Sequence, residues 1–204
     1  MSFNIKVPEK KSRVLVPAGA QVARIVSLLE IGTIPTRFFE EDGSVKHQKK
    51  IMLTFEFPNN TYVFEEAKGP EPLVISNEYT YSLDKKSKLL PVVKSLLGID
   101  PKEGEVVDIS ALVGKECFVQ IAHTTKGEDT YANVAGIMSV PTGVTVPPAH
   151  LPLRTLTYGS WDQEVYNALP PFIQDKMKTS AEYQKLFGGL AAKSAEAVKE
   201  FDKA

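Results

Sequence analysis

The sequence has 204 residues, of which 43% are hydrophobic and 24% are charged, as is ordinary for a globular protein. This composition excludes a wholly disordered chain, and the length allows one sizeable core with an appendage but not two large domains. Basic and acidic residues number 24 and 25, so the net charge of −1 excludes attraction to nucleic acid by overall charge, and any such attraction has to be local.

The first half of the sequence contains three predicted strands. The first, 20–31, has apolar side chains on both faces, which is typical of a coiled barrel strand that contributes to two halves of a closed sheet. A polar loop is predicted over 35–43. The second strand, 49–57, and the third, 73–83, alternate apolar and polar residues with the period of half-buried strands.

The period then changes to that of a helix over 84–97, with Asp84 as the predicted N-cap and Gly98 as the stop. Two further strands, 117–123 and 131–140, are joined by a predicted hairpin loop. Three strands, a helix and two strands follow the order of the OB fold. The sequence therefore predicts a mainly β protein, a five-stranded OB-fold-like antiparallel barrel with a helix between strands 3 and 4. An antiparallel sandwich without closure is the alternative.

Composition divides the chain into three predicted parts. Residues 1–141 form the barrel, which is the predicted nucleic-acid-binding domain, and the proline-rich segment 142–160 lacks alternation and reads as a linker. Residues 161–204 form a short helical C-terminal tail, broken by two glycines. Its apolar residues at helical spacing have to pack on the barrel, on a partner protein or on a second subunit, and these alternatives stay open.

Residues that would hold a metal or cross a membrane are sparse. Cys117 is the only cysteine, which excludes an intramolecular disulfide, and the histidines at 47, 123 and 150 lie far apart, so we expect no metal and no cofactor. The apolar stretch 89–97 is too short and too interrupted for a bilayer-spanning helix, and 1–13 lacks the apolar segment of a secretory signal. We therefore expect a cytoplasmic protein without membrane contact.

No catalytic pattern is present in the sequence. A search for nucleophile and base pairs, paired carboxylates and phosphate loops finds only Cys117 and His123 as neighbours. These two residues are six positions apart on one strand face, which is too far for contact. We expect a protein that is not an enzyme.

Residues suited to holding a single strand are better represented. Single strands bind to cations that follow the phosphates and to aromatic rings on which bases stack. The candidate DNA-binding residues are Arg24, Lys46, Lys49, Lys50, Tyr79, Tyr81, Lys85, Lys86, Lys88, Lys126 and Tyr131. Each has an ordinary alternative, because strand tyrosines often pack in cores and lysines often solvate surfaces. Phe38 and Phe39 are further candidates that would equally well plug the barrel mouth.

Several stretches together resemble a family of bacteriophage-encoded single-stranded DNA-binding proteins. They are PAGAQVARIVSLLEIG, KKIMLTFEF, ISNEYTYSLDKKSKLLPVVKSLLG, TYANVAGIMSVP and LPPFIQDKMKTSAEYQKL. The resemblance implies an OB-fold core that coats exposed strands during phage DNA replication or recombination in the host cytoplasm. Arg24, Tyr79, Tyr81 and Tyr131 match the sequence pattern of the family. The ending EFDKA departs from the acidic tip, closing on phenylalanine, that many such proteins carry.

Two other functions are compatible with the sequence. The first is an accessory protein of replication or recombination that uses the same fold, or its tail, to bind proteins, because fold alone does not determine function. The second is a phage structural or assembly protein, which would form a large stable homo-oligomer and have no affinity for DNA. Salt-dependent binding to single-stranded DNA would distinguish a DNA-binding protein from both of these alternatives.

Overall fold

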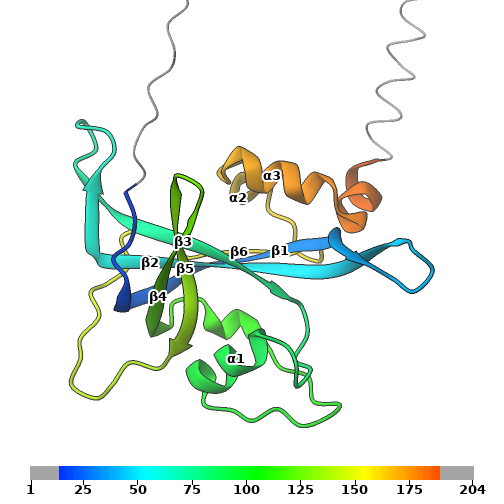
Figure 1. Ribbon diagram of the computed structural model, residues 1–204, viewed down its shortest axis with the longest axis horizontal. Helices are drawn as coiled ribbons and strands as arrows, with labels where there is room; N and C mark the ends of the chain where they lie inside the picture. The colour runs from blue at the N-terminus through cyan, green and yellow to red at the C-terminus, as the bar shows by residue number, and fades with distance from the viewer. Residues whose placement is uncertain (1–13, 189–204) are drawn as a thin grey trace, which may run out of the picture.

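The computed structural model describes residues 14–188, which form a long twisted sheet with helical layers on both of its faces (Figure 1). Residues 181–188 are also helical. The strands and helices are β1 (Gly19–Phe39), β2 (Val45–Val63), β3 (Pro70–Thr80), α1 (Leu89–Leu97), a 3-10 helix (Ile109–Leu112), β4 (Glu116–Lys126), β5 (Asp129–Met138), β6 (Arg154–Leu156), α2 (Gln163–Asn167) and α3 (Pro171–Lys178).

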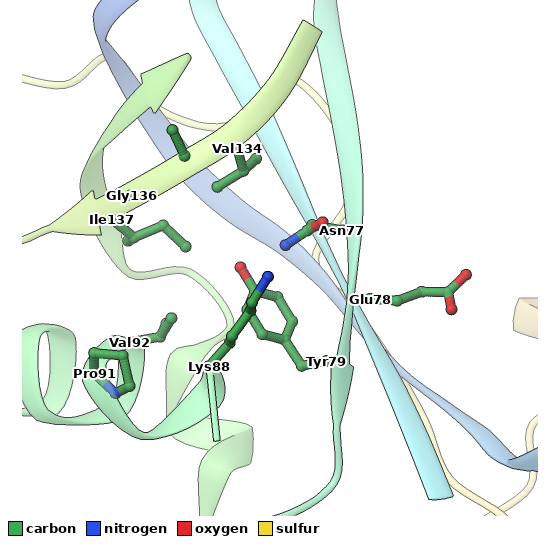
Figure 2. A pocket seen from close by; sticks show the side chains of 10 residues that line it. Asn77, Glu78, Tyr79, Lys88, Pro91, Val92, Val134, Gly136 and Ile137 are labelled. Atoms are coloured by element: carbon green, nitrogen blue, oxygen red, sulfur yellow. The ribbon is translucent and has the colours of Figure 1, made fainter. Parts of the chain in front are cut away.

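The sheet is open, which corrects the predicted barrel. Its antiparallel order is β3-β2-β1-β4-β5, and no hydrogen-bonded ladder joins the edge strands β3 and β5 in the described chain. Asn77 and Tyr79 of β3, Ile137 of β5 and Val92 of α1 line the space between the two edges (Figure 2). These side chains separate the backbones, which would have to approach to about 4.8 Å to form a ladder.

The inner face of the sheet carries the main core. The alternation predicted for the second strand is confirmed on its inner face, where Leu53 and Phe55 are fully buried together with Ile25 of β1. The strand is not half-buried as predicted, however, because Met52 and Glu56 on its other face are buried as well. The side chains of the inner face pack in one cluster with Leu89 and Val93 of α1. Burial of these apolar side chains, at about 25 cal/mol per Å², is the main source of stability for this half of the molecule.

Helix α1 lies between β3 and β4, as the sequence predicts, but it begins later than predicted. Its N-cap position is occupied by Lys88, which makes no side-chain capping hydrogen bond. The side chain of Asp84, the predicted cap, instead accepts a hydrogen bond from the backbone N–H of Lys86 at 2.9 Å, inside the preceding turn. Gly98 ends the helix as predicted.

A second core lies on the outer face of the sheet, beneath a segment that we call the C-terminal layer, residues 150–187. Leu29 and Ile31 of β1 and Met52 of β2 pack there against Ile173 and Met177 of α3. The C-terminal layer crosses the upper side of the sheet in Figure 1. The apolar residues on both faces of β1 thus reflect two separate cores rather than the two halves of a closed barrel.

The predicted linker therefore belongs largely to this layer, which corrects the predicted boundaries. Three of its residues form β6, which pairs in parallel with β1 over 27–29. A strand of three residues is too short to show alternation, which is why the sequence did not reveal it.

The side chain of Glu56 is fully buried in β2 and accepts hydrogen bonds from the backbone N–H groups of His150, at 2.8 Å, and Leu151, at 2.7 Å.

Polar contacts attach the far end of the C-terminal layer to β1. The carboxylate of Glu182 accepts hydrogen bonds from the backbone N–H of Thr33, at 2.6 Å, and from its hydroxyl, at 2.8 Å. Burial alone would raise the pKa of Glu182, but these two bonds and the charge of Lys49 outweigh burial and lower it below its usual value of 4.5. Gly32, with φ +93°, leaves room for Ser180 and Glu182 to approach the strand.

Among residues 14–188, no helix is both long and apolar enough to cross a membrane.

Candidate nucleic-acid interface

Arg24 does not present its charge for DNA. Its guanidinium group donates to the carbonyl oxygen of Gly114 at 2.9 Å and to that of Pro147 at 3.1 Å, and it forms an ion pair with Glu116 at 2.7 Å. Only 16% of the side chain is exposed. Arg24 therefore ties three segments of the chain together, and its predicted place in the DNA site is corrected to a structural one.

Tyr79 is likewise part of the core. Only 4% of the residue is exposed, and its ring points from β3 toward the space above α1 (Figure 2). Burial raises the pKa of its phenol above the usual value. Neither face of this ring is open to a stacking base, so Tyr79 is no longer a candidate for the DNA site.

Tyr81, two residues further along, has the opposite environment. It is 46% exposed, and the ammonium group of Lys49 lies 4.8 Å from the centroid of its ring. The backbone N–H of Tyr81 donates to the carbonyl oxygen of Lys49 at 2.8 Å, which continues the pairing of β2 with β3 and keeps the two side chains together. This pair combines a ring for a base with a cation for a phosphate.

The charge of Lys49 is shared with Glu30, whose carboxylate lies 2.6 Å from the ammonium group. Burial would lower the pKa of Lys49, but the hydrogen bond and the charge of Glu30 reverse this effect and raise it. Lys50 points elsewhere and donates to the hydroxyl of Thr80 at 2.9 Å. Burial and the neighbouring charge of Lys176 lower the pKa of Lys50 despite the opposing charge of Glu78.

Beyond Gly32, β1 and β2 continue as a two-stranded hairpin, 33–49, which we call the arm and which extends to one side in Figure 1. The predicted polar loop, 35–43, lies in this region. Its first part, 35–39, was wrongly assigned because it belongs to β1, whereas 40–43 do form the turn at the tip. Phe38 and Phe39 are exposed on the arm, the latter at 67%, and do not plug a barrel mouth. Arg37, which the sequence analysis missed, lies 5.3 Å from the ring of Phe38. The sequence feature that could have indicated Arg37 is its position directly before Phe38 and Phe39.

The remaining lysines fall into two places. Lys85, Lys86 and Lys88 are exposed in the turn 82–88, which we call the lysine turn, and none of the three forms an ion pair within the described residues. This turn follows Tyr81 directly. Lys46 of the arm is paired with Glu40 at 3.2 Å. The candidate interface therefore combines the arm, the Lys49 and Tyr81 pair, and the lysine turn.

Lys126 and Tyr131 lie on the β4–β5 hairpin, where they line a hollow with Thr124 and Asn133. The tip of this hairpin and the tip of the arm are well separated in Figure 1. The structure thus brings Tyr81 together with Lys49 but does not bring either of them to Tyr131.

Reactive side chains do not gather in the described chain. Cys117 is buried and donates to the carbonyl oxygen of Ala23 at 3.6 Å, and burial raises the pKa of its thiol to about 12. The ring of His123 is 2.8 Å from the carbonyl oxygen of Val16. Over residues 14–188, no three histidine, cysteine, aspartate or glutamate side chains are grouped so that they could hold a metal ion.

No protein-family model matches the chain, and no curated protein matches its sequence.

Proposed function

We propose that the protein binds single-stranded DNA, with little dependence on sequence, through the arm, Tyr81 and the lysine turn. The observation that carries the proposal is the pair formed by Lys49 and Tyr81, in which a half-exposed ring lies 4.8 Å from an ammonium group. Lys49 covers one face of the ring, so a base stacks on the opposite face. The charge of Lys49 is shared with Glu30, so the lysines of the lysine turn supply most of the charge for the phosphates of that strand.

This arrangement favours a single strand over a duplex. A base can stack on a side chain only when its face is free, and in a duplex both faces are covered by neighbouring base pairs. The exposed rings of Phe38 and Phe39 offer further stacking surfaces on the arm. The unpaired lysines of the lysine turn supply the positive charge that the chain as a whole lacks.

The order of the elements supports an OB-type origin for the sheet. Three antiparallel strands precede α1, and β4 and β5 follow it. OB-type proteins hold oligonucleotides on the second and third strands and on the adjoining loops, which here include the arm and the end of β3 next to Tyr81. The resemblance to phage single-stranded DNA-binding proteins gives the proposed setting, phage DNA replication or recombination.

Fluorescence anisotropy of labelled oligo-dT, at low and at moderate salt, tests the proposal. We expect tight binding that weakens as salt is raised, and much weaker binding to a duplex of equal length. Tyr81→Ala removes the stacking ring and should weaken binding about 10-fold. Lys86→Ala should weaken binding to all sequences alike and reduce the slope of the salt dependence by about one.

Tyr62→Ala provides a matched control. Tyr62 is 45% exposed, nearly the same as Tyr81, but it lies on the β2–β3 hairpin, where its ring packs at 5.1 Å on Phe64 and three glutamates are near in sequence. Its replacement should leave oligo-dT affinity unchanged. No binding to any strand at low salt contradicts the proposal and favours the protein-binding accessory or the assembly protein. An equal loss in both tyrosine variants contradicts the placement of the site.

A further inference from the structure

A groove of about 250 Å³ lies on the outer face of the sheet, between the strands and the C-terminal layer. Its floor is formed by side chains of β1, β2 and β3, and its walls by 151–154 and by 168–173. Nothing in the proposed function uses it. The groove nevertheless lies partly on β2, which also carries Lys49, and on β3, which is followed directly by Tyr81.

The walls of the groove are aliphatic. Leu29, Leu169 and Ile173 are buried and belong to the outer core, and Pro152 and Pro170 continue the lining toward its rim. Neither an aromatic nor an acidic side chain lines it. The walls therefore suit an apolar surface and offer no negative charge that would repel an anion.

Arg154 is the one charged residue in the lining. β6 holds its backbone beside Ser27 of β1 by parallel pairing. Its half-buried side chain has neither a hydrogen bond nor an ion pair within residues 14–188. The guanidinium nitrogens of Arg154 are open to solvent at the edge of an apolar groove and have no partner among the described residues, so they are available to an anionic ligand.

Hydroxyl groups supply the polar part of the floor. Thr54 and Ser76 share a hydrogen bond of 2.9 Å, and the hydroxyl of Ser27 has no partner in the described chain. A hydroxyl both donates and accepts, so it fits the edge of thymine, which presents carbonyl oxygens beside an N–H group, and that of cytosine, which presents an amino group beside a ring nitrogen and a carbonyl oxygen. Aliphatic walls fit the face of the same base and the methyl group of thymine.

We propose that this groove binds one pyrimidine nucleotide of the single strand, with the base between the aliphatic walls and its phosphate on Arg154. This inference rests on the proposed function and deepens it. Ser76 of β3 and Tyr81, which directly follows the end of β3, are five residues apart, or about 17 Å, so a strand stacked on Tyr81 reaches the groove a few nucleotides later. Between them, Glu78 is neutralised by its ion pair with Lys176.

The direct experiment is a titration of the full chain with dTMP, followed by two-dimensional NMR of the backbone amides. We expect the largest shifts at Ser27, Ser76 and Arg154, and weaker shifts with thymidine, which lacks the phosphate. Arg154→Gln should abolish the difference between the two ligands. It should leave the melting temperature unchanged, because the native side chain has no partner within the described chain.

The same variant is then tested on oligo-dT. Arg154→Gln should weaken binding about 10-fold at low salt, whereas Lys68→Gln, a charge removed from the β2–β3 hairpin, should have no effect. Failure of the wild-type protein to bind oligo-dT refutes the proposed function itself. Tight wild-type binding with an unaffected Arg154→Gln variant, and no dTMP shifts at the groove, refutes only the nucleotide site. Shifts caused by an acidic peptide but not by dTMP also refute it.

Discussion

Replacing Gly32 with alanine tests how the C-terminal layer is held on the sheet. Gly32 has φ +93°, a conformation that L side chains rarely adopt, and its missing Cβ would lie 2.7 Å from both Ser180 and a carboxylate oxygen of Glu182. The backbone strain costs about 1–2 kcal/mol. Displacing Glu182 weakens two hydrogen bonds to a charged group, which costs about 2–3 kcal/mol more. We expect a total loss of about 3–5 kcal/mol in the free energy of unfolding.

Gly43→Ala separates the two effects. Gly43 also has a positive φ, +82°, but no atom lies within 4 Å of the place of its Cβ, so only the backbone cost of about 1–2 kcal/mol applies. Urea unfolding followed by Trp161 fluorescence and by far-UV circular dichroism measures both variants. Trp161 is the only tryptophan and packs on Tyr158 and Tyr166 within the C-terminal layer, so its fluorescence reports on that layer.

In the Gly32→Ala variant, the fluorescence transition should move to lower urea than the circular dichroism transition, because the layer detaches before the sheet unfolds. Equal losses of stability in Gly32→Ala and Gly43→Ala would refute the reasoning. That result would mean that the layer shifts to accept the extra carbon at no cost, and that the bonds from Thr33 to Glu182 contribute nothing.

Three further predictions follow from the described contacts. The pKa of Glu182 is lowered in the folded protein, so the contribution of its carboxylate to stability is present above pH 4.5 and is lost as pH falls through the lowered pKa. Urea unfolding measured over this pH range should show the loss in the wild-type protein but not in Glu182→Gln. Cys117, with its pKa raised to about 12, should react with a maleimide only after unfolding, and a fast reaction of the native protein would contradict its burial. Arg24→Met should lower the free energy of unfolding by about 3 kcal/mol and leave the oligo-dT affinity of the folded protein unchanged, whereas a selective loss of affinity would return Arg24 to the DNA site.

Local patterns predicted the order of the elements in the main sheet. Alternation placed three strands before α1 and two after it, and Gly98 ended the helix as expected. The predicted first strand ended at residue 31, so the prediction missed the continuation of β1 through Pro35 to Phe39. Proline lacks a backbone N–H and normally argues against a strand, but β1 pairs only with β2 there, so one edge is free and proline is tolerated.

The roles of the candidate residues depended on burial, which residue type does not reveal. Tyr79 and Tyr81 look alike in the sequence, two positions apart on one strand. Tyr79 lies in the core, whereas Tyr81 comes after the last residue of β3 and is exposed beside Lys49. From the sequence, Arg24 looks like a free cation. In the folded protein its guanidinium group contacts the loops that carry Gly114 and Pro147.

The sequence by itself determined a mainly β protein with one helix inside the strand order and local cations beside aromatic residues, because these features arise from contacts between near neighbours in the chain. Only the tertiary structure decided that the sheet stays open, that 150–187 covers its outer face, and that Arg154 lies at a groove without a partner. The last two outcomes depend on segments more than a hundred residues apart, such as Thr33 with Glu182 and Ser27 with Arg154, and the first depends on β3 and β5, which α1 and β4 separate in the sequence. No local sequence pattern predicts contacts between segments that are so far apart.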